Sequence, residues 1–186
     1  LTRGVPERDA AVRGGAWNLA TGQASVAGSV VGVAGFGGSG LAFARAVLGL
    51  RPSRLAVWSP NLSRERLDAA LGPAAAALGV ELRAASFDEL LSGSDFLSLH
   101  LRLTAETAGL WGEAAFSRMK RGAYLVNTAR GGLVEASALA RALASGRLAG
   151  AGVDVYDVEP PPPGHPLLSA PNCVLTDHCA YRSTRS

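Results

Sequence analysis

From Val30 onward, the sequence alternates short apolar runs with longer segments in which apolar residues recur every three or four positions. Short continuous apolar runs are typical of strands buried on both faces, and the recurring pattern is typical of helices with one buried face. The alternation predicts an α/β fold, in which helices cover both faces of a parallel sheet of about seven strands. We expect strands at Val30 to Ala34, Leu55 to Trp58, Val80 to Arg83, Phe96 to Leu99, Ala123 to Val126, Ala151 to Val155 and Val174 to Thr176. We expect helices at Leu41 to Leu50, Arg64 to Leu71, Phe87 to Leu91, Glu113 to Met119 and Ser137 to Ala144, with a short one at Ala10 to Leu19.

The length of 186 residues suits one domain with a sizeable core. We expect a lead-in segment at 1–28, a main domain at 29–181 and a short tail at 182–186, and the absence of an initiator methionine suggests a piece of a longer protein. The chain has no apolar run near the roughly 20 residues that span a bilayer, and no secretory signal pattern. We therefore expect a cytoplasmic protein that does not bind membranes.

The charge and cysteine patterns point to no further ligand class. The formal net charge is +3, but the basic residues are scattered rather than grouped in a stripe, which favours a solvated surface over nucleic-acid binding. The two cysteines, Cys173 and Cys179, lack both metal-site and C-x-x-C spacing. We expect a reduced pair and no metal site, and the spacing gives no support to a disulfide.

A glycine-rich stretch lies between the first expected strand and the first long helix. Gly35, Gly37 and Gly40 match G-x-G-x-x-G in the context that this motif requires. Gly35 would allow a tight turn, Gly37 a close approach of a diphosphate, and Gly40 close packing of helix on strand. The amides of Gly38 and Ser39 would then face the diphosphate from a helix N-terminus. This predicts a Rossmann-type doubly wound sheet that binds a dinucleotide, in preference to a glycine turn without a ligand.

The residue that would contact the adenosine ribose falls at Ser59, where many dinucleotide-binding sheets have an acid. A hydroxyl can bond the ribose without repelling a 2′-phosphate. Arg64 and Arg66 follow closely and could meet such a phosphate, although an exposed helix face is the favoured interpretation of both. The choice between NAD and NADP stays open at this point.

Polar residues follow the later strands, at the edge where an open parallel sheet holds its ligand. They are His100, Arg130, Asp154 within the sixth expected strand, Glu159 and His178. Arg130 could pair two hydrogen bonds with a planar carboxylate, the alternative being a surface salt bridge. Glu159 and His178 could form an acid–base pair, in which the carboxylate orients the imidazole and stabilises its cation.

Three expectations concern how these polar residues are held. Gly131 and Gly132 would give the Arg130 loop the backbone freedom to place the guanidinium. Asp154, in an apolar setting, should accept a hydrogen bond from a ligand or from backbone amides. His165, within the segment PGHPLL, is expected to anchor a loop rather than react.

Taken together, these segments resemble the NAD(P)-dependent D-isomer-specific 2-hydroxyacid dehydrogenases, from about Ser29 to Tyr181. The resemblance is carried, in the order of the family, by VGVAGFGGSG, SFDELLSGSDFLSLHLRLTAETAGL, MKRGAYLVNTARGGLVEASALARALASGRLAGAGVDVYDVEP and HPLLSAPNCVLTDHCA. It implies an oxidoreductase that moves hydride between NAD(P)H and a small 2-oxo or 2-hydroxy acid. It assigns substrate binding to Arg130, a partner carboxylate to Glu159, proton transfer to His178, a place near the nicotinamide carboxamide to Asp154, and the cofactor lining to Thr128, Ala129, Arg130 and His178.

The chain departs from the family pattern at Ser39, Ser59, Arg102 and Asp177, the last of which replaces a proline before the histidine. The resemblance also implies a substrate domain built from both chain ends, which we expect to be missing here, and a homodimer of the full-length parent. Two alternatives to an enzyme are a binding module that senses NAD(H) and a truncated inactive remnant. The residues do not identify the 2-hydroxy acid.

Overall fold

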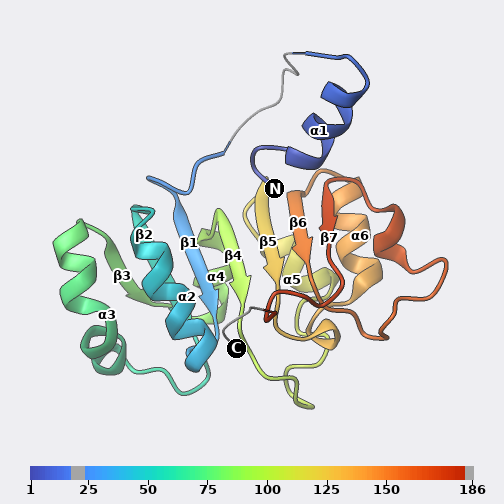
Figure 1. The fold of residues 1–186 in the computed structure, drawn as a ribbon. Coiled ribbons are helices and arrows are strands. Elements are labelled where there is room, and N and C mark those ends of the chain that lie inside the picture. Colours follow the sequence, from blue (N-terminus) through green and yellow to red (C-terminus); the bar gives the residue numbers. More distant parts are fainter. Residues whose placement is uncertain (18–23, 183–186) are drawn as a thin grey trace.

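A computed structural model describes residues 1–17 and 24–182. Within these ranges, one sheet of seven parallel strands has the order β3-β2-β1-β4-β5-β6-β7 (Figure 1). The strands are β1 (Val30–Ala34), β2 (Arg54–Trp58), β3 (Glu81–Ala84), β4 (Phe96–Leu99), β5 (Ala123–Asn127), β6 (Leu148–Val153) and β7 (Cys173–Leu175). All seven expected strands are present, and β1 and β4 have the predicted bounds. Because β1 lies between β2 and β4, the chain reverses its direction of winding at β1.

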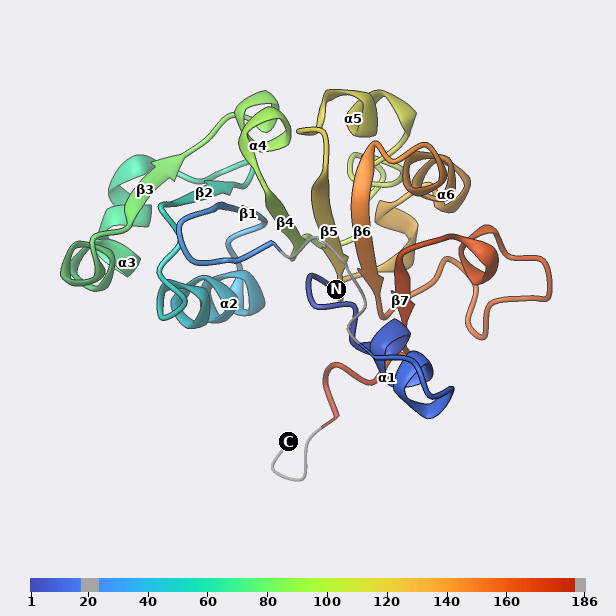
Figure 2. The ribbon, with the colours of Figure 1, turned by 90° about the horizontal axis from the view of Figure 1, so that it is seen from above.

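Helices cover both faces of the sheet, as predicted. The α-helices are α1 (Val5–Arg13), α2 (Gly38–Leu48), α3 (Arg64–Leu78), α4 (Phe87–Gly93), α5 (Glu113–Arg118) and α6 (Ala136–Ala144), with 3₁₀ turns η1 (Gly131–Leu133) and η2 (Pro166–Ser169). Figure 2 shows α4, α5 and α6 on one face, and α2 and α3 on the other. The doubly wound α/β architecture is therefore confirmed.

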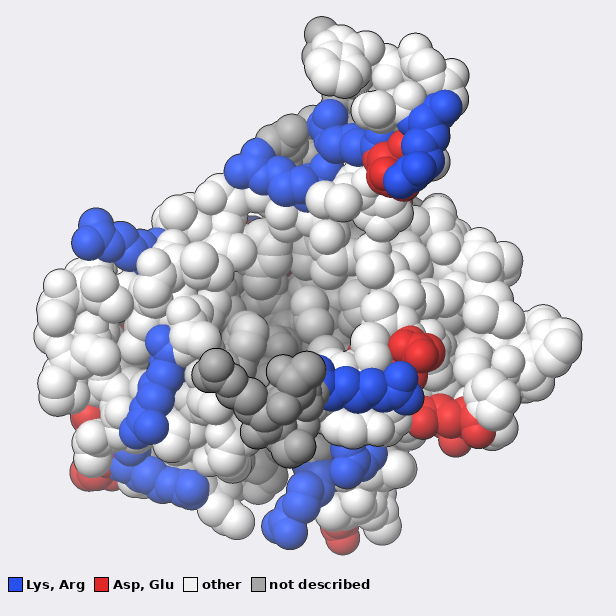
Figure 3. Space-filling view, viewed as in Figure 1, with Lys and Arg blue, Asp and Glu red and all other residues white. Residues whose placement is uncertain are grey.

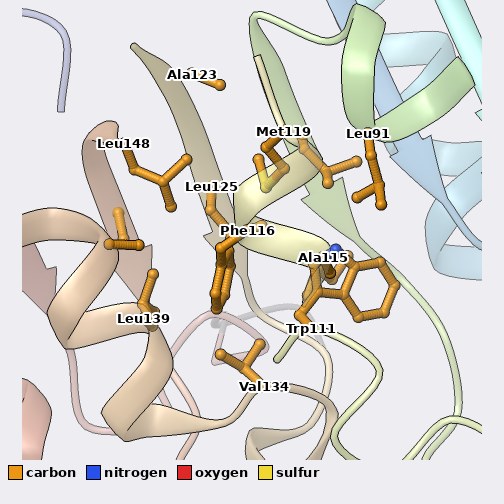
Figure 4. Close-up of a cluster of buried hydrophobic side chains, with 14 of the residues drawn as sticks. Leu91, Trp111, Ala115, Phe116, Met119, Ala123, Leu125, Val134, Leu139 and Leu148 are labelled. Atoms are coloured by element: carbon orange, nitrogen blue, oxygen red, sulfur yellow. The ribbon is translucent and has the colours of Figure 1, made fainter. Parts of the chain in front are cut away.

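The period of two along each strand divides the core into two clusters. Leu55 and Val57 pack with the buried residues of α2 and α3, whereas Ala56 between them belongs to the cluster under α4, α5 and α6. Successive side chains of a strand point to opposite faces, so a central strand needs apolar residues at nearly every position. Figure 4 shows the cluster under α4, α5 and α6, where Leu125 of β5 lies near Phe116 of α5.

Several expected elements have different bounds: α2 begins at Gly38 and ends at Leu48, where Leu41 to Leu50 was expected, and β6 and α3 also differ. β6 begins at Leu148 and ends at Val153, so Asp154 follows the strand instead of lying within it. The small residues of this strand, which include Gly150 and Gly152, weaken the apolar pattern and hid its first half. α3 continues to Leu78 through Pro73, because the alanine run after the proline has high helix propensity.

The N-terminal helix was predicted incorrectly. It spans Val5–Arg13 rather than Ala10 to Leu19, since Pro6 suits the first turn of a helix and Gly14 ends it. Leu19 lies outside the described residues. α1 buries none of its residues and lies by the edge where the strands begin (Figure 1). No helix in the described ranges is long and apolar enough to cross a membrane.

Replacing Leu125 by alanine should lower the free energy of unfolding by about 2–5 kcal/mol, because the side chain is 0% exposed and its loss leaves a cavity. Urea denaturation measures this change. Leu50→Ala is the control: Leu50 is 55% exposed, and the expected change is within about 0.5 kcal/mol. Equal losses in the two variants would contradict the assignment of the core.

Candidate functional site

The glycine loop lies where β1 separates the two halves of the sheet. The amide of Gly35 donates to the carbonyl of Trp58, the last residue of β2, at 2.7 Å. Gly35 has a φ of 104°, and a Cβ on it would lie 2.6 Å from the carbonyl carbon of His100, which follows β4. The loop is thus wedged between the ends of β2 and β4, and only glycine fits its first position.

The other glycines of the loop divide into a packed one and two open ones. A Cβ on Gly40 would lie far inside contact distance of the Gly35 carbonyl oxygen, so this glycine lets α2 pack on β1. Gly37 and Gly38 have nothing within 4 Å of a Cβ, and Gly37, the N-cap of α2, makes no side-chain capping bond. Exposed amides therefore begin α2 at Gly38 and Ser39, where the helix dipole favours an anion. A diphosphate fits this site.

His100 packs against the glycine loop, close to Gly35 and Gly40. Its Nε2 lies 2.9 Å from Ser98 Oγ, and its ring centroid is 4.9 Å from that of Phe43 in α2. Burial lowers the pKa of His100, which keeps the imidazole neutral around neutral pH. These contacts with Ser98 and Phe43 give His100, the polar residue after β4, a structural role.

Asn127 at the end of β5 holds the Arg130 loop. Its side chain is 1% exposed, its Nδ2 donates to the Arg130 carbonyl at 3.0 Å, and its Oδ1 accepts from the Ala129 amide at 3.1 Å. These bonds leave Thr128 and Arg130 exposed, with Arg130 Nη1 donating to the Ala129 carbonyl at 2.6 Å. Asn127 was not among the residues predicted from the sequence, although a polar residue at the end of an apolar strand is a usable signal.

Close packing against backbone requires the glycine at position 131, whereas backbone freedom was expected from the sequence to explain both Gly131 and Gly132. Neither has a positive φ. A Cβ on Gly131 would collide with the backbone of Tyr156, and one on Gly132 would lie 2.9 Å from the side chain of Leu103. The Arg130 loop therefore packs directly against the loop that follows β6.

Glu159 and His178, which the sequence suggested as a possible acid–base pair, are in contact. Glu159 Oε2 lies 2.7 Å from His178 Nδ1, and Glu159 Oε1 accepts from the Tyr156 amide at 3.0 Å. The hydrogen bond with His178, followed by that from Tyr156, lowers the pKa of Glu159. A fixed carboxylate thus orients the ring through Nδ1, which leaves Nε2 as the nitrogen available to a reactant. His178 has a φ of 54°, an uncommon conformation for a residue with a side chain.

Asp154 holds the turn that carries His178. Its carboxylate accepts from Thr176 Oγ1 at 2.5 Å, from the Cys179 amide at 2.9 Å and from the Ala180 amide at 3.0 Å. Burial opposes its ionisation, but the bonds from Thr176 and from the Ala180 and Cys179 amides outweigh burial and lower the pKa of Asp154. The expected backbone-amide partners are confirmed, and the carboxylate joins the end of β6 to the segment after β7.

The remaining predicted residues have mixed outcomes. His165 anchors a loop, with Nε2 3.0 Å from Asp157 Oδ1 and Nδ1 accepting from the Leu167 amide at 3.3 Å. Ser59 directly follows β2 and is half-buried, beside the glycine loop. Cys173 and Cys179 are free thiols. Among the described residues, no cluster of three or more histidine, cysteine or acidic side chains could hold a metal ion.

Comparison with known proteins agrees with this geometry. A family model described as the NAD binding domain of D-isomer specific 2-hydroxyacid dehydrogenase matches residues 1–180. The chain is 39% identical to a D-3-phosphoglycerate dehydrogenase of Archaeoglobus fulgidus over 98% of this chain and 33% of that protein. It is 40% identical to a glyoxylate reductase of Korarchaeum cryptofilum over 99% of this chain and 54% of that protein.

A solved structure of an NAD-dependent formate dehydrogenase from Staphylococcus aureus, in complex with NAD, superposes with a TM-score of 0.81. The two are 32% identical, and the match covers 96% of this chain and 51% of that one. The chain thus spans about a third to a half of the length of these relatives.

Gly40→Ala should lower the free energy of unfolding by about 1–3 kcal/mol, because the added Cβ must push α2 away from the Gly35 carbonyl. Gly38→Ala is the matched control, since its Cβ meets nothing within 4 Å, and alanine restricts the unfolded chain. Denaturant unfolding of both variants measures the difference. Equal stability of the two would contradict the packing derived for the loop.

Asp154→Asn should cost about 1–3 kcal/mol at neutral pH, because the buried carboxylate accepts three hydrogen bonds. The lowered pKa of Asp154 means that this stabilisation is present above the ordinary carboxyl pKa of about 3.9 and is lost as the pH falls through the lower, folded-state value. The acid dependence of urea unfolding should therefore be weaker in Asp154→Asn.

The exposed neighbour Asp177 provides the control, because Asp177→Asn should change stability by less than about 0.5 kcal/mol. An Asp154→Asn variant with the stability and acid dependence of the unchanged protein would refute the role of this carboxylate.

Proposed function

Because this chain belongs to the D-isomer specific 2-hydroxyacid dehydrogenase family, as its NAD-binding domain, we propose that it binds NAD or NADP and serves a dehydrogenase of small 2-hydroxy acids. The observation that carries the proposal is the contact between Glu159 and His178 beside the Arg130 loop, at the sheet edge that holds the glycine loop. A binding module that only senses the cofactor has no need of an oriented acid–base pair. We take residues 29–181 as the cofactor domain and 1–28 as a lead-in to a substrate domain.

The proposed cofactor site begins at the open side of the glycine loop, at Gly37 and Gly38. Gly35, Gly37 and Gly40 shape the loop, and the amides of Gly38 and Ser39 would bind the diphosphate. Ser59 would bond the adenosine ribose. Thr128, Ala129, Arg130, Asp154 and His178 would line the nicotinamide end. The bound nicotinamide would supply or accept the hydride at its C4.

Arg130 would bind the substrate, and His178 would transfer the proton. Arg130 would hold the carboxylate and carbonyl of a 2-oxo acid by paired hydrogen bonds. Protonated His178 would donate from Nε2 to the carbonyl oxygen as hydride reaches C2, and would accept that proton in the reverse direction. Glu159 would hold the ring through Nδ1 and stabilise its cation, which is the state that carries the proton.

The partner class is a small 2-oxo or 2-hydroxy acid, and the assembly we propose is a homodimer of the full-length protein. The names of two relatives, a glyoxylate reductase and a D-3-phosphoglycerate dehydrogenase, support this substrate class. The identity of the acid would be decided by residues of the substrate domain.

His178→Gln should lower turnover by about 10²–10⁴-fold, because glutamine occupies a similar volume but cannot take or give the proton. Steady-state assays with glyoxylate, hydroxypyruvate and pyruvate, with NADH and with NADPH, measure it in the protein expressed from its complete reading frame. Glu159→Gln should lower turnover to a smaller extent.

Fluorescence titration of the reduced cofactors is the control, and their affinities should change far less than turnover. A His178→Gln variant with full turnover would eliminate the proposed proton transfer. A protein that binds cofactor tightly and reduces none of the three acids would favour the sensing module.

A further inference from the structure

We propose that this chain selects the 2′-phosphorylated dinucleotide, NADP(H), and that Arg66 is the residue that binds the phosphate. The inference rests on the proposed function, because it concerns the same cofactor site. It addresses the choice between NAD and NADP, which the sequence left open. It is argued from the arrangement of Ser59 after β2, Phe36 in the glycine loop, and Arg64 and Arg66 in the first turn of α3.

The end of β2 lacks the charge that would exclude a 2′-phosphate. Ser59 follows Trp58, whose carbonyl accepts the amide of Gly35, so Ser59 lies next to the first glycine of the loop. In sheets of this type, an acid at this place bonds the ribose 2′-hydroxyl and repels a phosphate there. A serine hydroxyl bonds either form of the ribose without repulsion.

Arg66 places its guanidinium on the glycine loop itself. Its Nη2 donates to the Phe36 carbonyl at 3.3 Å, and its Cζ lies 5.8 Å from the centroid of the Phe36 ring. Phe36 is the second residue of the loop and is 4% exposed, so it provides a fixed platform. A guanidinium has five N–H groups, and the bond to Phe36 uses one of them. Arg66 is exposed to solvent and its remaining donors can reach a ligand.

Arg64 is the natural alternative, but an acidic side chain pairs with its charge and two of its donors bond protein groups. Its Nε lies 2.6 Å from Asp68 Oδ2, and its Nη1 donates to the Leu82 carbonyl of β3 at 3.0 Å. The hydrogen bond with Asp68 raises the pKa of Arg64, as expected for a neutralised pair. Arg64 is therefore directed toward β3, which is separated from β1 and its glycine loop by β2.

The charge near Arg66 is not balanced by a carboxylate. In the part of the chain that the structure describes, Arg66 makes no ion pair, whereas Arg64 has Asp68. Glu65 lies between them, but hydrogen bonds with its own amide and with Ser63 lower its pKa and hold it at the start of α3. Figure 3 shows several basic side chains, with acidic ones among them, along the lower edge of the molecule, where the strands end. A cation on the glycine loop without a carboxylate partner, together with a neutral residue at position 59, suits a phosphate ester.

Fluorescence titration with NADPH and with NADH tests the proposal in the protein expressed from its complete reading frame. We expect NADPH to bind at least about tenfold more tightly than NADH at low salt. Arg66→Ala should lower this preference by about tenfold, through weaker NADPH binding, with NADH affinity within about twofold. Circular dichroism melting should show that the variant stays folded, because Arg66 is exposed.

Two further variants make the test specific. Arg64→Ala is the matched control, and it should keep the preference within about twofold, because Arg64 pairs with Asp68. Ser59→Asp should reverse the preference toward NADH, because the carboxylate would bond the 2′-hydroxyl and repel the phosphate. Displacement of bound NADPH by 2′,5′-ADP and by 5′-AMP compares ligands that differ in the 2′-phosphate and lack the nicotinamide. The 2′,5′-ADP should displace NADPH at the lower concentration.

The outcomes separate the two proposals. Equal or tighter binding of NADH, or an unchanged preference in Arg66→Ala, would overturn the inference while leaving the dehydrogenase proposal intact. A preference that is lost in Arg64→Ala and kept in Arg66→Ala would also overturn it. Binding of neither cofactor would defeat both proposals.

Discussion

The parallel direction of all seven strands is the constraint on which the site depends. Parallel strands end at the same edge, so the loops after β1, β4, β5, β6 and β7 meet there although they are far apart in the sequence. Close approaches of backbone to backbone fix how these loops fit together. Gly35 meets His100 after β4, and Gly131 meets Tyr156 after β6. The sheet therefore brings the glycine loop, the Arg130 loop and the segment of Glu159 to one edge.

Buried polar side chains then convert these loops into a fixed platform. Asn127 satisfies two backbone groups of the Arg130 loop, and Asp154 accepts three bonds from the segment around His178. A buried amide or carboxylate is costly without partners, so each has effectively one arrangement that satisfies it. In this account Asp154 acts on the reaction through the turn that it holds. The contact between Glu159 and His178 can be short because both ends of that turn are held in place.

Much of this was predictable from local pattern, and the rest depended on distant contacts. The apolar runs identified the strands, and the position of G-x-G-x-x-G between strand and helix identified the loop. The role of Gly131 could not be read in the same way, because the packing of two separate loops places it against Tyr156. Asn127 bonds within its own loop, and the polar residue at the end of an apolar strand was a local signal of its role. Asp154 was placed within a strand because the valines on both sides of it continue the apolar pattern, whereas β6 ends at Val153. Sequence also could not separate Arg64 from Arg66, since only their partners distinguish them.

The central claim is that a dinucleotide lies across this edge, with its diphosphate at the start of α2 and its reactive end between Arg130 and His178. A crystal structure of the protein grown with NADPH tests it most directly. The account predicts the diphosphate oxygens within hydrogen-bond distance of the Gly38 and Ser39 amides, and the nicotinamide ring on the side of β5 and β6. A dinucleotide bound at another face, or a diphosphate that contacts neither amide, would contradict it.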